Sequence, residues 1–358
     1  MLPETTNERY NNFELLRLLA ALLVLIYHSY WLWNITDPLL RVGIPYPLSG
    51  CGVAIFFVIS GFLVCKSLLH STIKGYLLNR FLRIWPALAA CTVFTLIVPG
   101  LFFTTLPTKE FLSHPQTLYF FWQNLLPYRV AFYLPGVFNG ESVNGSLWTI
   151  PLEIKLYFVL LIISLAGLLK RKELFLFAWI AVLILFVAFN SSFVKLDKYF
   201  EAQRFFIYGL LFSGGALFYL FKEKIPFTWY IFIFLFVAYT ATLLWFPSLQ
   251  RITEYPFYIY TVLAIGCSKT KIPFMKADIS YGMYLYAFPI QQCIYYTWGT
   301  SLSFLNYNLL AIALTSILAT ASWYIIEKKA LLLKKRSGFS MLAGYRVQHP
   351  EENTYKQK

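Results

Sequence analysis

Charge is scarce in this chain of 358 residues. Charged side chains make up 13% of the residues, whereas hydrophobic side chains make up 59%. A soluble domain carries about 25% charged residues, so this chain has too little polar surface to face water on all sides. A soluble protein, with or without a single anchor, is therefore excluded, and the composition predicts a polytopic membrane protein.

Acidic residues and cysteines are also few. Sixteen acidic residues against 30 Lys and Arg leave a formal net charge of +14. Basic residues in the cytoplasmic loops of a membrane protein explain this excess, so we predict no nucleic-acid partner. The five cysteines are scattered through apolar segments without a CxxC or His–Cys cluster. We therefore expect neither a disulfide framework nor a metal site.

Long apolar runs fill most of the chain. Ten of them have near-spanning length, which predicts an all-α polytopic membrane protein with about ten transmembrane helices. They cover approximately residues 14–33, 51–69, 84–105, 146–168, 174–190, 204–221, 228–246, 252–268, 280–298 and 304–326.

The basic residues between these runs predict the orientation. With a cytoplasmic N-terminus, the inner loops and the tail carry 17 Lys and Arg, and the outer loops carry 7. Cytoplasmic loops are enriched in these residues, so we expect both termini in the cytoplasm. We expect one membrane domain over 1–336, an outer cap over about 106–145 that is ordered or lies in the interface, and a polar, disordered tail over 337–358.

Two ionisable residues interrupt the first apolar run, FELLRLLAALLVLIYHSYW. Arg17 and His28 are eleven residues apart, which places both on one helix face, roughly 16 Å apart along the axis. Ionisable groups in a span usually face the protein interior or a water-filled cavity. Snorkelling to the headgroups is the alternative for Arg17, and a hydrogen-bonded core position is the alternative for His28. The pair on one stripe favours a shared cavity.

A carboxylate lies at a matching depth in the fourth run. Glu153, in GSLWTIPLEIKLYF, is one to two turns from the outer end, as is His28. A carboxylate at this level can orient an imidazole and stabilise its protonated form, so we predict that the two residues are partners. A Glu153–Lys155 ion pair is the weaker alternative, because residues two apart on a helix point apart.

Two further motifs lie in the second and third runs. Arg80 and Arg83, in NRFLRIWP, share a face at the cytoplasmic mouth of the third run. They either set the topology or bind phosphate, for which a guanidinium is well shaped. Ser60 and Gly61, in GVAIFFVISGFLV, allow close helix packing. We expect Ser60 to bond its own helix backbone rather than act as a nucleophile.

Together these segments resemble the membrane acyltransferases of the acyltransferase-3 family, in the same order and over nearly the whole chain. Arg17 and His28 match its Arg-x10-His signature, and FFVISGFL, RFLRIWP and SLWTIPLEIKLYF resemble three more of its segments. SYGMYLYAFPI resembles its Ser-Tyr-x-x-Tyr-Leu-x-His-x-Pro-Ile segment, except that Ala287 replaces the histidine. A proton-transfer role for the ninth run is therefore not carried over.

The resemblance implies an enzyme that transfers an acyl group, commonly acetyl from acetyl-CoA, to a sugar hydroxyl in a surface polysaccharide, glycolipid or related acceptor. It implies that Arg80 and Arg83 hold the CoA phosphates and that Arg17 stabilises the pantetheine or thioester region. His28, backed by Glu153, would act as the general base or position the acyl group.

In this interpretation acyl-CoA is a cosubstrate, the glycan acceptor and the lipid bilayer are the partners, and no metal takes part. From the resemblance we also expect a location in the bacterial inner membrane and a stand-alone form, without the extra extracytoplasmic domain of some family members. A transporter or flippase of a polar or glycan substrate, and a non-catalytic membrane scaffold, are the alternatives.

Overall fold

The computed structural model describes residues 11–44, 46–193, 200–268 and 277–336. Over these residues the protein is all-helical, and its only extended pairing is an isolated bridge between Thr104 and Val137. The predicted tail over 337–358 lies outside the described residues. So do Lys195, Lys198, Lys269, Lys271 and Lys276, which contribute to the charge tally of the loops.

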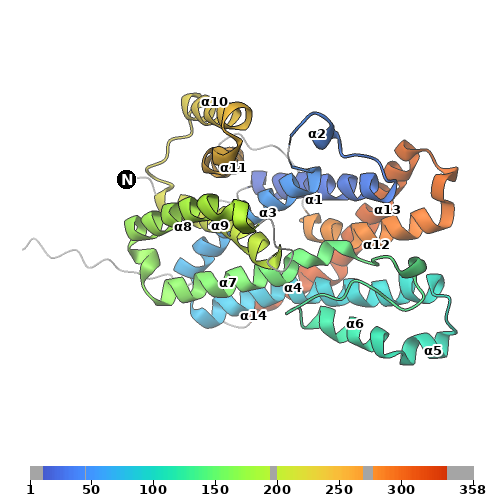
Figure 1. The fold of residues 1–358 in the computed structure, drawn as a ribbon. Coiled ribbons are helices and arrows are strands. Elements are labelled where there is room, and N and C mark those ends of the chain that lie inside the picture. The colour runs from blue at the N-terminus through green and yellow to red at the C-terminus, as the bar shows by residue number, and fades with distance from the viewer. Residues whose placement is uncertain (1–10, 45, 194–199, 269–276, 337–358) are drawn as a thin grey trace, which may run out of the picture.

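Each of the ten predicted apolar runs coincides with a long helix (Figure 1). These helices are α1 (Asn11–Leu32), α3 (Leu48–Leu69), α4 (Ile73–Thr95), α7 (Thr149–Leu165), α8 (Lys172–Phe193), α9 (Phe200–Phe221), α10 (Trp229–Trp245), α11 (Gln250–Gly266), α12 (Ser280–Trp298) and α13 (Phe304–Ser322). The shorter helices are α2 (Pro38–Arg41), α5 (Thr108–Ser113), α6 (Pro115–Leu125) and α14 (Lys328–Arg336).

Seven helices in the described part of the chain are long and apolar enough to cross a membrane: those at Asn12–Leu32, Leu48–Leu69, Ile73–Leu101, Gly145–Leu165, Lys172–Phe189, Glu201–Phe221 and Phe304–Leu333. The expected all-helical architecture is therefore present, with seven candidate spans where about ten were predicted. Helices α10 and α11 have 17 residues each, short of the roughly 20 that a span needs. Helix α12 carries five tyrosines and two glutamines, which lower its hydropathy.

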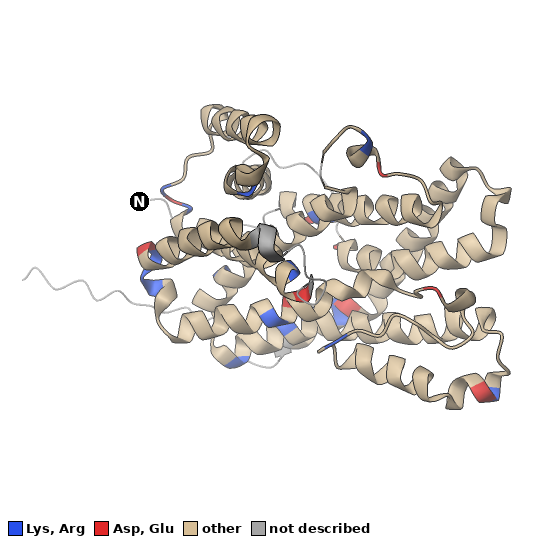
Figure 2. Cartoon of the chain, in the orientation of Figure 1, with Lys and Arg blue, Asp and Glu red and all other residues tan. Residues whose placement is uncertain are grey.

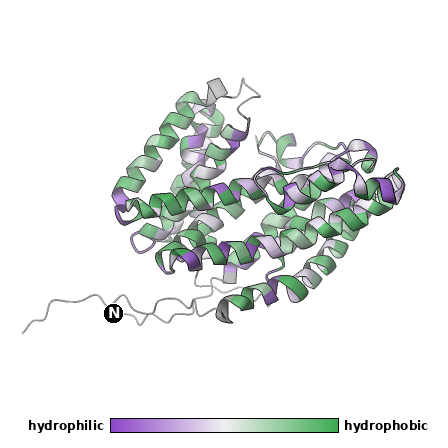
Figure 3. Ribbon diagram, turned by 90° about the horizontal axis from the view of Figure 1, so that it is seen from below, coloured by the Kyte–Doolittle hydropathy of each residue, from purple (hydrophilic) through white to green (hydrophobic). Residues whose placement is uncertain are grey.

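Charge and hydropathy follow the same pattern along the fold. Most of the ribbon carries no charged residue (Figure 2), and the long helices are predominantly hydrophobic along their length (Figure 3). Many large apolar side chains on these helices are exposed, among them Ile184, Phe234, Val237 and Ile317. In water such a surface would be costly, whereas in a bilayer it contacts lipid chains.

Helix α3 lies at the centre of the bundle and packs against α1 and α9. Two glycines allow the contact with α9. A Cβ atom at Gly61 would lie 1.8 Å from the carbonyl oxygen of Phe212, and one at Gly215 would lie 2.2 Å from that of Val58. The backbones of the two helices therefore touch, which confirms the close packing predicted at Ser60-Gly61.

Helix α12 is buried along most of its length, between α1 and α13. The side chain of Gln291 donates to Ser29 Oγ at 2.7 Å and to the Leu25 carbonyl at 2.9 Å, which ties α12 to α1. The hydroxyl of Tyr307 in α13 donates to the Gln291 carbonyl at 3.0 Å. These bonds tie the polar helix α12 to its neighbours inside the bundle, although the buried Oε1 atoms of Gln291 and Gln292 have no hydrogen-bond partner among the described residues.

The segment over 106–145, predicted as a cap that is ordered or lies in the interface, is ordered, and helices α5 and α6 lie in its first half. Phe111 and Phe120, from α5 and α6, form a small core with the chain around Phe138. Helix α6 runs back alongside α4 (Figure 1), and Trp85 Nε1 of α4 donates to the Leu125 carbonyl at 3.0 Å. The cap therefore folds back along the bundle instead of remaining at its end.

Candidate active site

Four of the five predicted site residues converge on one cavity, which we call the arginine cavity. It has a volume of about 80 Å³, and Arg17, Arg80, Arg83 and Glu153 all line it. They come from α1, α4 and α7, with α3 and α12 supplying the remaining walls. The motif residues are thus far apart in the sequence and close together in the fold.

Asp278 links two of these arginines. Its Oδ2 lies 3.4 Å from Arg17 Nη1 and 3.0 Å from Arg83 Nη2, and its Oδ1 accepts a hydrogen bond from Ser280 Oγ at 2.6 Å. Burial by itself would raise the pKa of Asp278, but the guanidinium groups of Arg83 and Arg17 outweigh it and lower the pKa to about 2. The carboxylate therefore stays ionised and holds α1, α4 and the start of α12 together.

Arg80 has a different environment. Its guanidinium lies over the ring of Tyr157, 5.5 Å from the ring centroid, and its Nε is buried without a hydrogen-bond partner. No ion pair of Arg80 is found among the described residues. Arginine donates five N–H groups in a planar fork that fits phosphate, so Arg80 is available to an anion that enters the arginine cavity.

Glu153 is bonded within the same cavity. Its Oε1 accepts hydrogen bonds from Ser60 Oγ, at 3.0 Å, and from the hydroxyl of Tyr157. The expectation that Ser60 bonds its own backbone is therefore wrong, because a carboxylate on the neighbouring helix offers a stronger acceptor. Lys155 lies over the ring of Tyr128 instead of pairing with Glu153, as the helical spacing predicts.

His28 lines a second cavity of about 350 Å³, which we call the histidine cavity. The ring of Phe288 packs edge-on against the imidazole, with centroids 4.8 Å apart, and His28 Nδ1 is buried without a hydrogen-bond partner. The hydrogen bonds of Glu153 run to Ser60 and Tyr157, so the predicted Glu153–His28 contact is not formed. Helical spacing does not give the direction in which each side chain points, which depends on how α1 and α7 are rotated in the bundle.

The two cavities meet at Tyr284 and Val53, which line both. The hydroxyl of Tyr284 donates to the Ser146 carbonyl at 2.6 Å and lies 2.7 Å from Thr149 Oγ1. Tyr284 is thereby fixed as a partition between the cavities. Arg17 and His28 share a helix face, as predicted, but lie on different sides of this partition.

Sequence reasoning missed Asp278 and Tyr284. Asp278 has a recognisable signal, because it is the sole acidic residue between Glu254 and Glu327 and lies two residues before the SYGMYLYAFPI segment. Tyr284 lies within that segment, but one tyrosine among the 26 in the chain has no distinguishing signal until the fold places it between two cavities.

Comparison with known proteins gives three findings. A family model described as an acyltransferase domain matches residues 10–328. The chain is 29% identical to an O-acetyl transferase of Shigella phage Sf6, over 90% of this chain and 96% of the relative. It is 27% identical to nodulation protein 10 of Rhizobium leguminosarum bv. viciae, over 92% of this chain and 96% of the relative. No solved structure matches.

Proposed function

The chain belongs to the acyltransferase-3 family, and from this premise we propose that it transfers an acetyl group from acetyl-CoA to a hydroxyl of a sugar in a surface glycan or glycolipid. The expected enzyme class, an O-acetyltransferase, is supported by the family and by the O-acetyl transferase of phage Sf6. The convergence of Arg17, Arg80, Arg83 and Glu153 on one cavity carries the proposal for the donor.

In this proposal the arginine cavity receives the donor. Three guanidinium groups against the two carboxylates of Asp278 and Glu153 leave an excess of positive charge, which suits the phosphates of CoA. Arg80 binds phosphate most directly, because it has no ion pair among the described residues. Arg83 and Arg17, already held by Asp278, form a fixed positive wall beside the pantetheine and thioester.

The chemistry then takes place at the partition. The sugar hydroxyl oxygen attacks the thioester carbon, the C–O bond forms as the C–S bond breaks, and CoA leaves as the thiolate. His28 takes the hydroxyl proton on its neutral imidazole, as a general base worth typically 10²–10⁴-fold. Its unpartnered Nδ1 supports this role, because a histidine kept for structure alone would normally have both ring nitrogens satisfied.

A transfer assay separates this function from transport. Purified protein in liposomes is supplied with radiolabelled acetyl-CoA and with envelope glycan of the source cells, de-O-acetylated by mild base. An acetyltransferase moves label into the glycan and releases CoA in equal amount. Glycan that crosses the bilayer while acetyl-CoA stays intact would establish the transporter or flippase. A scaffold would do neither.

A further inference from the structure

The walls of the histidine cavity combine aromatic faces with charged and amide side chains. Tyr27, Trp148 and Tyr208 supply aromatic surface, and Gln203 and Arg251 supply hydrogen-bonding groups. A sugar ring needs both kinds of wall, because its C–H faces pack on aromatic rings while its hydroxyls need donors and acceptors. All three motif arginines line the arginine cavity, whereas the basic residues of the histidine cavity are Arg204 and Arg251.

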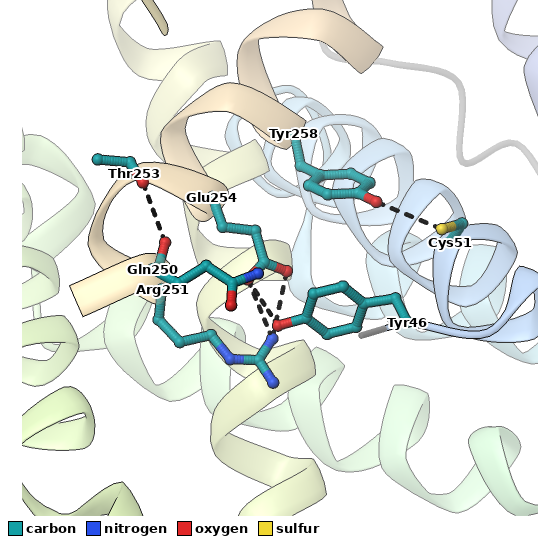
Figure 4. Close-up of polar contacts among 7 residues, drawn as sticks. All are labelled: Tyr46, Cys51, Gln250, Arg251, Thr253, Glu254 and Tyr258. Carbon is teal, nitrogen blue, oxygen red and sulfur yellow. Dashed lines mark hydrogen bonds and ion pairs between the residues drawn. The ribbon is translucent and has the colours of Figure 1, made fainter. Parts of the chain in front are cut away.

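A fixed polar cluster stands in the α11 wall of this cavity (Figure 4). Arg251 Nη1 lies 3.2 Å and 3.3 Å from the two carboxylate oxygens of Glu254. The hydroxyl of Tyr46 donates to Glu254 Oε2 at 2.7 Å, and the Arg251 guanidinium lies 4.7 Å from the Tyr46 ring centroid. We call Tyr46, Arg251 and Glu254 the α11 cluster.

The α11 cluster is preorganised and still has groups to offer a ligand. Among the described contacts Nη1 is the guanidinium atom that bonds Glu254, so the other N–H groups of Arg251 remain for an oxygen in the cavity. A buried ion pair is weak support for stability alone. A rigid donor and acceptor pair that faces a cavity can hydrogen-bond the hydroxyls of one sugar and leave those of another sugar unpaired.

The reacting group lies on the α1 side of the same cavity. The same cavity is lined by His28, whose Nδ1 lacks a partner, and by Tyr284, which borders the arginine cavity. A sugar in the histidine cavity would therefore contact the α11 cluster with some hydroxyls while presenting another to the imidazole. One cavity thus supplies both recognition and the reacting position.

We propose that the histidine cavity is the acceptor subsite, that it binds one pyranose residue of a glycan, and that Tyr46, Arg251 and Glu254 determine which sugar is accepted. This inference rests on the proposed function, because it assigns the acceptor of that same reaction. The α11 cluster acts on binding and specificity, and it takes no part in breaking the thioester.

Kinetics in liposomes test the subsite, with acetyl-CoA as donor and the base-deacetylated envelope glycan as acceptor. Glu254→Gln and Arg251→Lys should each raise the KM for the glycan at least about tenfold while the KM for acetyl-CoA changes less than about twofold, because they remove acceptor contacts alone. The control is Thr253→Val, since Thr253 lies on the same helix but bonds Thr242 of α10. Its KM values should match the wild type.

A second variant covers the case in which breaking the ion pair unfolds the protein. Ser49 lines the histidine cavity and is not a member of the α11 cluster, so Ser49→Trp should fill the cavity while leaving the Arg251–Glu254 ion pair in the sequence. It should block transfer to the glycan and leave acetyl-CoA binding unchanged.

The outcomes separate the two proposals. Absence of transfer by the wild type would overturn the proposed function itself. Normal glycan KM values in all three cavity variants, with an active wild type, would overturn the acceptor subsite and leave the acetyltransferase standing.

Discussion

At the scale of single residues, His28 presents a buried imidazole nitrogen without a partner. His28→Ala should lower acetyl transfer by at least about 10²-fold, because the reaction loses its general base. Binding of acetyl-CoA should be unchanged, since the arginine cavity lies beyond Tyr284. Transfer and equilibrium binding of radiolabelled acetyl-CoA are both measured on the purified variant.

His70→Ala is the matched control for this substitution. His70 Nε2 forms a hydrogen bond with the hydroxyl of Tyr219 at 2.9 Å and lines neither cavity. Its transfer rate should stay near the wild-type value. Near-normal turnover of His28→Ala would remove the histidine from the mechanism and leave a packed core position as its role.

Asp278 allows a prediction about pH. Its pKa is about 2 in the folded protein, against an ordinary value of 3.8. The stabilisation is therefore complete above about pH 4 and is lost as the pH falls through about 2. Asp278→Asn should lower the Tm, because it leaves two largely buried guanidinium groups without their shared carboxylate. The Tm difference from the wild type should be constant from pH 8 to 5 and shrink only below about pH 4.

Thermal unfolding in detergent, followed by tryptophan fluorescence, measures this difference. Glu110→Gln is the control, because Glu110 is exposed on α5. If the Tm difference for Asp278→Asn already decreases between pH 7 and 5, the ion pairs of Asp278 with Arg17 and Arg83 do not account for it.

At the scale of elements, the contact of α3 with α9 depends on the absence of side chains. Gly61→Ala should destabilise the fold by about 1–3 kcal/mol, the usual cost of overpacking, because the new Cβ would meet the backbone of Phe212. Gly209→Ala on α9 is the control, since its Cβ would lie 3.4 Å from the mobile end of Leu156. Denaturation of both variants measures the cost, and equal stability would rule out the close crossing.

Apolar runs predict where the helices of this protein lie in the sequence, but not where each helix begins or which helices pack together. Each run coincides with a helix, yet α4 begins at Ile73 instead of near residue 84. Arg80 and Arg83 look like a loop boundary in a hydropathy pattern, whereas in the fold they point into a cavity and remain inside the helix. The return of α6 along α4 had no signal, because it depends on contacts between segments that hydropathy does not relate.

The same limit applies to the site. Spacing predicts that Arg17 and His28 share a face and that Arg80 and Arg83 share another, since these relations lie within one helix. The Ser60–Glu153 bond and the Asp278 triad join different helices, so their formation depends on how the helices rotate against each other.

At the scale of the whole molecule, the proposed direction of transfer depends on topology. Reporters fused after Lys172 and after Arg336 should report the cytoplasm, and one near Gly140 should report the outside, because the Lys and Arg of the loops favour this orientation. Activity of paired cytoplasmic and periplasmic reporters gives the location. A cytoplasmic signal near Gly140 would show that the number of crossings before the cap is even.

The position of Tyr284 between the two cavities also matters for ion leakage across the membrane. An open aqueous route through a membrane protein would let ions run down the transmembrane potential, which is worth about 2.3 kcal/mol per elementary charge at 100 mV. Tyr284 lies where the two cavities meet and is held there by its hydrogen bonds to Thr149 and Ser146. In the proposed function only a small neutral acetyl group needs to pass this tyrosine, so acetylation outside the cell would not require an open ion path.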